Sequence, residues 1–348
     1  MLQWREFTNK EGSMQSLKLG IVGATGLVGR EFLKLLEERK TPIEELRLFA
    51  SEKSAGTKIS FRGKDIEVQA LKESCFKGLN VCFFSAGGSV SKIWAPRAVK
   101  DGAYAIDNSS AFRMHPEVPL VVPEVNMHAI DSKLGPQLIA NPNCSTIQML
   151  VALKPIQEKF GLTSVIVSTY QSVSGAGSDA VEEVKGHSLA YLNNQELEPE
   201  IFPKSIAFNN IPMIGDMEDN GFTSEEMKMV NETKKILEQD DLPVSAFCVR
   251  TPSLNGHSES VWFDVKSNPS KEEMISCLNT SKGIDMSLKD LPTIREASGK
   301  NPVFVGRVHK DVAVANRWIM WVVADNIRKG AALNGLQIAE SLFDKSQN

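Results

Sequence analysis

The chain has 348 residues, of which 42% are apolar and 24% are charged. This balance is typical of a globular protein and excludes a disordered or fibrous one. The formal net charge of -4, without long Lys/Arg blocks, gives no electrostatic basis for binding nucleic acid or an anionic membrane, so neither partner is expected. At roughly 100–200 residues per domain, the length predicts two domains, or one large α/β unit with an inserted module.

The cysteines and the N-terminal segment favour a cytoplasmic protein. The five cysteines form no C-x-x-C pair, and an odd number fits no closed disulfide framework. No apolar run approaches the ~20 residues that are needed to cross a bilayer. Residues 1–16 lack the apolar core of a secretory signal, and Glu6 and Glu11 argue against a transit peptide. We therefore read 1–16 as a polar N-terminal tail, which an alternative start at Met14 would shorten.

The first part of the chain predicts a βαβ unit. The apolar run LKLGIV begins at Leu17 and is followed by the turn GATGLVG and by REFLKLLEER, whose apolar residues recur at helical spacing. Further strands are predicted at the runs ELRLFAS, VCFFSAGG, AYAIDNSS and QLIANPN. Several of these runs end at small polar residues. Because ligands bind beyond the carboxyl ends of strands in an open parallel sheet, we expect these residues to line one cleft.

The pattern changes after Cys144. The run TIQMLVALKPIQEKF predicts a helix, and the longer runs LTSVIVSTYQSV, PVSAFCVRTP and SESVWFDV predict the strands of an α+β domain. The last stretch, ADNIRKGAALNGLQIAESLF, reads as a helix whose Ala and Gly residues allow close packing against the first domain's sheet. The predicted fold is α/β, with a Rossmann-type parallel sheet domain of residues 17–143 and 326–345 and an α+β domain of residues 144–325.

The turn Gly23–Gly29 has the spacing G-x-x-G-x-x-G rather than the usual G-x-G-x-x-G, but it lies between a strand and a helix. Glycines there let the backbone approach a pyrophosphate, and the helix N-terminus offers unpaired N–H groups. The alternative is a plain tight turn.

The end of the second predicted strand favours NADP over NAD. NAD-binding folds usually carry an acid there, whereas this chain has Ala50-Ser51. Ser51, Lys53 and Ser54 can donate hydrogen bonds to a 2′-phosphate, provided that Glu52 points away. The alternative is a solvated loop.

Cys144 lies in NPNCST, between a predicted strand and a predicted helix, where the helix N-terminus would stabilise a thiolate. The other cysteines lie in helix- or strand-like runs and read as small core residues: Cys75, Cys82, Cys248 and Cys277. A nucleophilic Cys beside a nucleotide domain suggests aldehyde oxidation, because an aldehyde loses hydride only after a thiolate has added to it. His257, on a Gly-containing turn between two strands, is the best candidate for the base, although a surface histidine is the alternative.

Eight segments in order resemble the signature segments of aspartate-semialdehyde dehydrogenase, and they span the chain from Leu17 to Phe343. They are GATGLVG, FSAGG, DNSSAFR, NPNCST, STYQSVSGAG, EEMK, the R-x6-H pair Arg250 and His257, and ADNIRKGAALN. The resemblance implies that residues 17–143 and 326–345 bind NADP and that residues 144–325 form the catalytic and dimerisation domain of a homodimer.

The resemblance implies a role for four residues at the reacting carbon. Cys144 would be the thioester-forming nucleophile and His257 the acid/base. Gln171 would orient the substrate or the thiol, and Asn143, with backbone N–H groups, would stabilise the oxyanion.

The resemblance also assigns the binding residues. Arg250 would hold the substrate α-carboxylate in a bidentate pair and Glu225 the α-amino group, while Arg113 and Lys228 would bind inorganic phosphate. The residues implied in NADP binding are Thr25, Gly26, Leu27, Val28, Ser51, Ser54, Ala55, Ser85, Gly87, Ser174, Gly175 and Asn326. No metal site is expected.

The implied reaction is the reversible conversion of aspartate semialdehyde, phosphate and NADP to aspartyl phosphate and NADPH, in lysine, threonine and methionine synthesis. One rival is N-acetyl-glutamyl-phosphate reductase, against which an acid such as Glu225 facing a free ammonium argues. Another is a non-catalytic NADP-sensing protein, against which the intact set Cys144, Gln171, Arg250 and His257 argues.

Several of these residues also have structural readings. Thr223 and Glu226 fit a helix capping box, and Glu225 and Lys228 fit a surface ion pair. Arg113 also reads as a solvated loop residue, and Gln171 as a polar residue on a strand.

Overall fold

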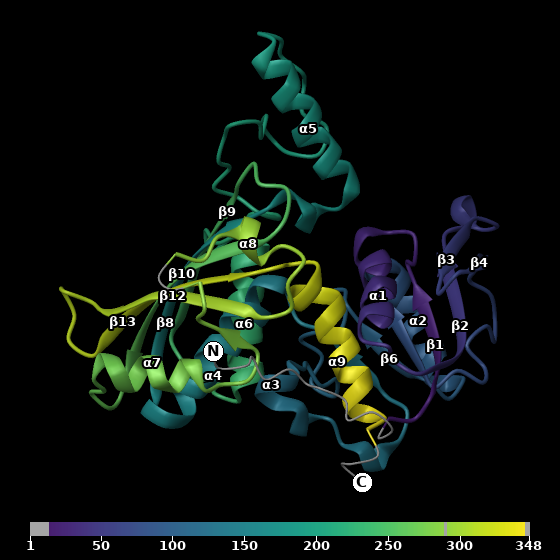
Figure 1. The fold of residues 1–348 in the computed structure, drawn as a ribbon, viewed down its shortest axis with the longest axis horizontal. Helices are drawn as coiled ribbons and strands as arrows, with labels where there is room; N and C mark the ends of the chain where they lie inside the picture. Colours follow the sequence, from purple (N-terminus) through teal and green to yellow (C-terminus); the bar gives the residue numbers. More distant parts are fainter. Residues whose placement is uncertain (1–13, 289–290, 345–348) are drawn as a thin grey trace. The chain divides into compact units, whose positions relative to one another are not determined.

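The computed structural model describes residues 14–288 and 291–344, which divide into two compact units (Figure 1). The N-terminal unit contains residues up to Asn143 together with Ala331 onward, and the central unit is Cys144–Gly330. Residues 1–13 of the predicted tail and residue 345 of the predicted Rossmann-type domain lie outside the described residues.

The N-terminal unit is built on a seven-stranded sheet of order β3-β4-β2-β1-β5-β6-β7. All neighbours pair in parallel except the antiparallel hairpin β3–β4. The strands are β1 (Leu17–Val22), β2 (Ile43–Ala50), β3 (Lys58–Phe61), β4 (Lys64–Ala70), β5 (Val81–Phe84), β6 (Tyr104–Asp107) and β7 (Leu138–Ala140). The central strands β1 and β5 are almost wholly apolar because both of their faces are covered.

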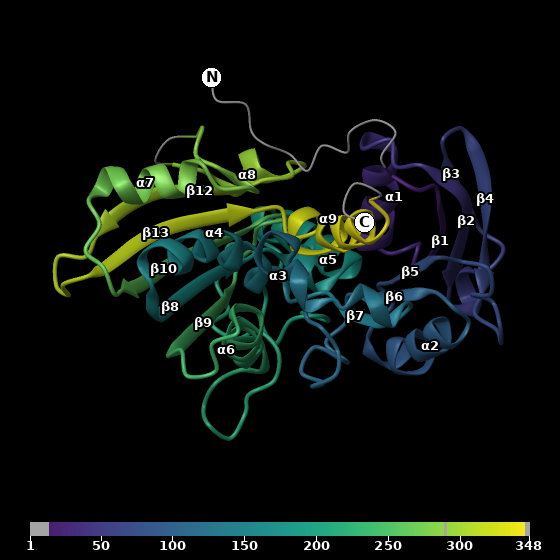
Figure 2. The ribbon, with the colours of Figure 1, turned by 90° about the horizontal axis from the view of Figure 1, so that it is seen from below.

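Helices cover both faces of this sheet (Figure 2). On one face, α1 (Leu27–Glu38) and α9 (Leu333–Leu342) pack against the sheet through residues such as Phe32 and Leu336. On the other face lies α2 (Gly88–Lys100), through Ala95 and Ala98. The short helix α3 (Pro123–Asn126) contacts α9. The unit is therefore a three-layer, Rossmann-type domain.

The central unit contains a six-stranded sheet of order β11-β12-β13-β10-β8-β9. Its strands are β8 (Leu162–Gln171), β9 (Val244–Arg250), β10 (His257–Val265), β11 (Ile284–Asp285), β12 (Val303–Lys310) and β13 (Arg317–Ala324). The pairs β8–β9 and β11–β12 are parallel and the others antiparallel. The helices α4 (Cys144–Phe160), α6 (Ser224–Leu237) and α7 (Lys271–Asn279) pack on the sheet and on one another through α4.

Two further helices complete the central unit. The helix α5 (Ser178–Leu192) projects away from the sheet, over a small separate core that includes Val184 and Ile206 (Figure 1). The short helix α8 (Ile294–Ala297) packs against β13. Within the described ranges, no helix is both long enough and apolar enough to span a bilayer.

The predicted fold class is confirmed, since a largely parallel sheet domain is joined to a second domain of mixed α and β structure. The predicted return of the chain to the first domain at residue 326 is wrong, because the boundary falls between Gly330 and Ala331. Asn326 stays with the central unit because its side chain accepts a hydrogen bond from the Gly256 N–H.

The predicted C-terminal helix is also interrupted. Ala324 ends β13, and a π-helix (Arg328–Ala332) precedes α9. In α9, Gly335 allows the close approach to the sheet that the small residues predicted, since a Cβ there would lie 2.4 Å from the Phe83 ring.

A buried ion pair joins α1 to α9. The Glu340 carboxylate accepts three hydrogen bonds from Arg39, the shortest at 2.7 Å, and one from Thr41 Oγ1 at 3.1 Å. We expect Glu340→Ala to lower the free energy of unfolding of this unit by about 3–5 kcal/mol, because Arg39 would be left buried without its carboxylate. Denaturant titration would measure the loss.

The matched control is Glu38→Ala, which removes the exposed pair with Lys34 at 3.8 Å on the same helix. Its expected cost is below about 1 kcal/mol. Equal losses of unfolding free energy in the two variants would contradict the view that Glu340 fixes α9 to the end of α1.

Candidate active site

The predicted cofactor residues of the N-terminal unit gather at one edge of its sheet. Thr25–Val28, Ser51 and Ser85 follow the carboxyl ends of β1, β2 and β5, which are adjacent strands. From β1 the chain passes through α1 to β2, which pairs with one edge of β1. The other edge of β1 pairs with β5. This is the topological switch point at which open α/β sheets bind ligands.

The Gly-rich turn is packed so tightly that only glycine fits two of its positions. Gly23 has φ +88°, and a Cβ there would lie 2.3 Å from the Ser85 carbonyl oxygen. A Cβ on Gly29 would lie 2.3 Å from the Gly23 carbonyl oxygen. Gly26 is the N-cap of α1, and among the described residues no side chain caps the first N–H groups there. The turn therefore offers backbone donors to an anion.

The residues predicted to favour NADP form a short 3-10 helix, Glu52–Ser54, rather than an open loop. Ser51 is its exposed N-cap, and the Ser54 N–H donates to the Ser51 carbonyl oxygen at 2.9 Å. Ala55 ends this turn. Glu52 and Lys53 are both exposed. Gly87 (φ +87°), in the loop that follows β5, is the N-cap of α2.

Three predicted residues of the central unit meet where adjacent strands end. Gln171 ends β8, Arg250 ends the neighbouring β9, and His257 begins β10. Gln171 is the register partner of both Arg250 and His257, so the three side chains point to the same face of the sheet. All three are buried, which excludes the reading of His257 as a surface histidine.

Cys144 lies at a helix N-terminus as predicted, but α4 begins two residues before the predicted start at Thr146, so Cys144 is its first residue; it is partly exposed. Its thiol lies near enough to Arg250 to act on the pKa of that guanidinium. A Cβ on Gly330 would lie 2.8 Å from the Cys144 Cβ, so the chain at Gly330 packs directly on the cysteine.

The other four cysteines are buried, and burial raises the pKa of each thiol: Cys75, Cys82, Cys248 and Cys277. Cys75 lies in a turn rather than in the predicted helix or strand. The contrast with partly exposed Cys144 supports reading these four as core residues.

The His257 ring has a defined orientation. Its Nδ1 accepts a hydrogen bond from the Ser172 backbone N–H at 3.1 Å, so the proton of the neutral ring sits on Nε2. Nε2 has no hydrogen-bond partner among the described residues. Burial lowers the pKa of His257 to about 3, helped by the Arg250 guanidinium. The ring is therefore neutral near pH 7 and presents an N–H donor.

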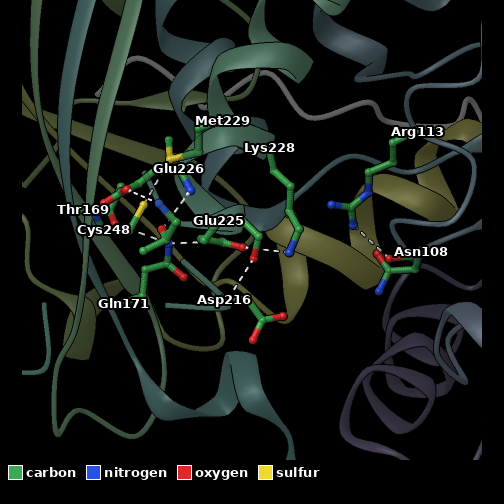
Figure 3. A network of polar contacts seen from close by, with 12 residues as sticks. Asn108, Arg113, Thr169, Gln171, Asp216, Glu225, Glu226, Lys228, Met229 and Cys248 are labelled. Carbon is green, nitrogen blue, oxygen red and sulfur yellow. Dashed lines mark hydrogen bonds and ion pairs between the residues drawn. The ribbon is translucent and has the colours of Figure 1, made fainter. Parts of the chain in front are cut away.

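Glu225 connects the polar residues of this site (Figure 3). Its Oε1 accepts from Gln171 Nε2 at 3.3 Å, and its Oε2 accepts from Lys228 Nζ at 3.2 Å. The predicted Glu225–Lys228 ion pair is present, but only Lys228 is substantially exposed, with side-chain exposures of 35% and 7% for Lys228 and Glu225. The predicted capping box of Thr223 and Glu226 is confirmed.

Three residues predicted to contact the cofactor surround His257. Asn326 Oδ1 accepts hydrogen bonds from the Gly256 N–H at 2.8 Å and from Ser174 Oγ at 3.2 Å. A Cβ on Gly175 would lie 3.1 Å from Arg250 Nη1 and 3.4 Å from His257 Nε2. The backbone at Gly175 thus lies directly beside both side chains.

Sequence reasoning missed Asp325. Its Oδ2 accepts from Asn255 Nδ2 at 2.9 Å and from the Gly299 N–H at 2.7 Å, and its Oδ1 accepts from the Arg328 N–H at 2.9 Å. It joins the loops at Asn255 and Gly299 to the first residue of the π-helix. The available signal was an acid directly after a strand and directly before Asn326.

Arg113 and Asn143 belong to the N-terminal unit. Arg113 is buried, and its guanidinium donates to the carbonyl oxygens of Asn141 and Asn108, each at 3.0 Å (Figure 3). The reading of Arg113 as a solvated loop residue is therefore wrong. Asn143 is buried and directly precedes Cys144 in the chain.

The contact between Gly330 and Cys144 gives a test of the nucleophile's setting. We expect Gly330→Ala to lower the rate of Cys144 alkylation by iodoacetamide about tenfold, because the new methyl group would displace the thiol; a shift of about 1 Å can change reaction rates 10²-fold. The alkylated residue would be identified by peptide mass spectrometry.

Gly186→Ala, at a helical position with no atom within 4 Å of the added Cβ, is the control. An alkylation rate in Gly330→Ala that matches this control would show that the contact does not set the position of Cys144.

Two family models cover most of the chain. The model described as semialdehyde dehydrogenase, NAD binding domain, matches residues 18–133. The model described as semialdehyde dehydrogenase, dimerisation domain, matches residues 153–329.

Individual proteins are similar over nearly the whole length. The aspartate-semialdehyde dehydrogenase of Bacillus subtilis is 51% identical over 340 residues, covering 94% of this chain and 98% of the relative. The structure of aspartate semialdehyde dehydrogenase II from Vibrio cholerae has a TM-score of 0.91 at 46% identity and covers 94% of this chain and 98% of that one. The structure of aspartate semialdehyde dehydrogenase with NADP from Candida albicans has a TM-score of 0.74 at 27% identity, and the match covers 95% of this chain and 99% of that one. The chain therefore belongs to the aspartate-semialdehyde dehydrogenase family.

Proposed function

We propose that the protein converts aspartate semialdehyde, phosphate and NADP reversibly to aspartyl phosphate and NADPH, through a thioester on Cys144. The observation that carries this proposal is the meeting of Gln171, Arg250 and His257 at adjacent strand ends, with Cys144 electrostatically coupled to Arg250. A nucleophile, a hydrogen-bond donor and an anion-binding guanidinium thus belong to one rigid sheet and the helix packed on it.

In the oxidative direction, the Cys144 thiolate adds to the aldehyde carbon and the carbonyl oxygen becomes an oxyanion. The Nε2–H of His257 is available to donate to this oxyanion, and Asn143 is the further donor that the family implies. NADP, when bound, supplies the oxidised nicotinamide that accepts the hydride. Phosphate oxygen then attacks the thioester carbon, the C–S bond breaks, and Cys144 leaves as a thiolate.

Arg250 and Glu225 suit the two charged ends of an amino acid. Burial lowers the pKa of Arg250, so an anion is needed to compensate this cation, and the substrate α-carboxylate would bind it with two parallel hydrogen bonds. The buried Glu225 carboxylate would accept from the α-ammonium group. An N-acetylated substrate has no ammonium group, which supports aspartate semialdehyde over the N-acetyl-glutamyl rival.

Lys228 and Arg113 are proposed to bind phosphate. Lys228 is the more exposed partner of Glu225, and its three N–H donors are not all used in that pair. The Arg113 guanidinium is held in place by two backbone carbonyl groups, which fixes its direction.

The N-terminal unit is proposed to be the NADP domain, extending in part to Ser174, Gly175 and Asn326 of the central unit. The glycine turn before α1 fits a pyrophosphate, because side chains are excluded at Gly23 and Gly29. Ser51 and Ser54 stand where an NAD-binding fold would have an acid, and they would donate to the 2′-phosphate. The Candida albicans relative with NADP supports the same choice.

The decisive experiment mixes the protein, NADP and aspartate semialdehyde with and without phosphate and follows NADPH absorbance. We expect phosphate-dependent turnover with a higher kcat/KM for NADP than for NAD. Cys144→Ala should abolish turnover while NADP affinity stays within about twofold, because the thiol performs chemistry and not cofactor binding.

Equal activity in Cys144→Ala would overturn the nucleophile assignment. An unmodified protein that binds NADP without phosphate-dependent turnover would favour a sensor, and would also remove the proposed place in cytoplasmic lysine, threonine and methionine synthesis. A higher kcat/KM for NAD than for NADP would contradict only the proposed hydrogen bonds from Ser51 and Ser54 to the 2′-phosphate.

We further propose a homodimer formed through the sheet face of the central unit opposite α4 and α6. Ile166, Tyr170 and Phe247 are exposed on this face, and the half-buried Trp262 lies in register between Ile166 and Ile319. An apolar sheet face of this kind is typical of a protein interface. The family model that matches this unit is described as a dimerisation domain.

Sedimentation equilibrium should therefore give twice the chain mass, and Phe247→Asp should shift the protein toward monomer because a carboxylate would be buried in the interface. Val312→Asp, on an exposed turn residue away from this face, should leave the dimer intact. A monomeric unmodified protein, or an unaffected Phe247→Asp dimer, would contradict the proposal.

A further inference from the structure

Two buried polar side chains lie behind the proposed catalytic groups. Glu259 is two residues beyond His257 on β10, so both side chains point to the same face of the sheet. Gln148 is four residues beyond Cys144 on α4, so it lies on the same side of the helix as the nucleophile. Glu259 and Gln148 are both 0% exposed.

Gln148 connects the helix to the strand. Its Nε2 donates to the backbone carbonyl oxygen of His257 at 3.3 Å. The Gln148 side chain also lies close enough to Glu259 to act on that carboxyl group. α4 therefore contacts β10 through a polar pair that lies one turn below Cys144.

Three oxygen atoms of this pair are not satisfied by the rest of the described chain. These buried atoms have no hydrogen-bond partner among the described residues: Glu259 Oε1, Glu259 Oε2 and Gln148 Oε1. An ionised carboxylate in that setting would carry a desolvation cost of several kcal/mol. Accordingly, burial raises the pKa of Glu259 well above its ordinary value, against only a partial lowering by Gln148.

A protonated carboxyl group has one O–H donor, and Gln148 Oε1 is an acceptor without a partner. We propose that Glu259 is a neutral acid that donates to Gln148 Oε1, and that it is a positioning residue which fixes α4 against β10 and so sets the separation of Cys144 and His257. This inference rests on the proposed function, because it assigns Cys144 and His257 their roles.

Glu259 acts through another residue and not on the substrate. The proposed chain of contacts runs from the Glu259 carboxyl to the Gln148 amide, and the observed hydrogen bond continues it from that amide to the His257 carbonyl oxygen. Arg250, which would hold the substrate carboxylate, is on β9 and outside this chain of contacts. Loss of the Glu259 donor should therefore lower kcat and leave the KM for aspartate semialdehyde little changed.

The test compares Glu259→Gln with Glu259→Leu. Glutamine keeps the size and always has an N–H donor, so kcat should stay within about twofold of the unmodified enzyme. Leucine removes the donor, and kcat should fall about 10- to 100-fold with KM within about threefold, because small displacements of reacting groups cost rate. Thr233→Val, which removes another buried hydroxyl without a partner in the described chain, is the matched control and should change neither constant.

Infrared spectroscopy supplies a readout that a purely structural role would not change. The unmodified protein should show a protonated-carboxyl C=O band that is missing in Glu259→Gln. If Glu259→Leu does not fold, Gln148→Met, which removes the acceptor at similar length, should show the same fall in kcat. If neither Glu259→Leu nor Gln148→Met folds, the comparison of the infrared band between the unmodified protein and Glu259→Gln tests the proposal.

The proposal is overturned by an unchanged kcat in Glu259→Leu, by damage in Glu259→Gln equal to that in Glu259→Leu, or by absence of the infrared band. Its failure can be told from failure of the proposed function. In the first case the unmodified enzyme still turns over with phosphate and Cys144→Ala does not, whereas in the second the unmodified protein has no phosphate-dependent turnover.

Discussion

The register of β8 with its two neighbours determines the central unit's polar site. Gln171 pairs with Arg250 on one side and with His257 on the other. Since side chains alternate between sheet faces, a slip of one residue in either pair would turn one of these groups to the opposite face. The strands are long, and buried residues that pair across them, such as Val167 and Val261, hold the register. The packing of strand residues away from the site therefore sets the positions of Gln171, Arg250 and His257.

Charge is distributed so that the buried groups can coexist. Arg250 is a cation, Glu225 is close enough to raise the pKa of that guanidinium, and His257 remains neutral because burial and Arg250 both lower its pKa. Glu259, behind them, has a raised pKa. Glu225 is therefore the carboxylate that acts on the guanidinium, together with the thiols of Cys144 and Cys248.

The sequence predicted features that depend on local pattern. Examples are the strand, turn and helix around Gly23–Gly29 and the position of Cys144 at a helix N-terminus, because apolar periodicity and glycine spacing act over a few residues. It did not predict that Gln171 and His257 are register partners, since they are far apart in the chain and only the family resemblance linked them. It missed Glu259 because a carboxyl group within a strand gives no signal before its surroundings are known, and it missed Asp325 although that acid directly follows a strand.

The chain passes between its two units twice, from Asn143 to Cys144 and from Gly330 to Ala331. Gly330 packs on the Cys144 Cβ, so both covalent crossings occur beside the same sulfur atom. The first and last residues of the central unit therefore hold each other in place, and a substitution at either end of this long segment bears directly on the position of the same sulfur atom.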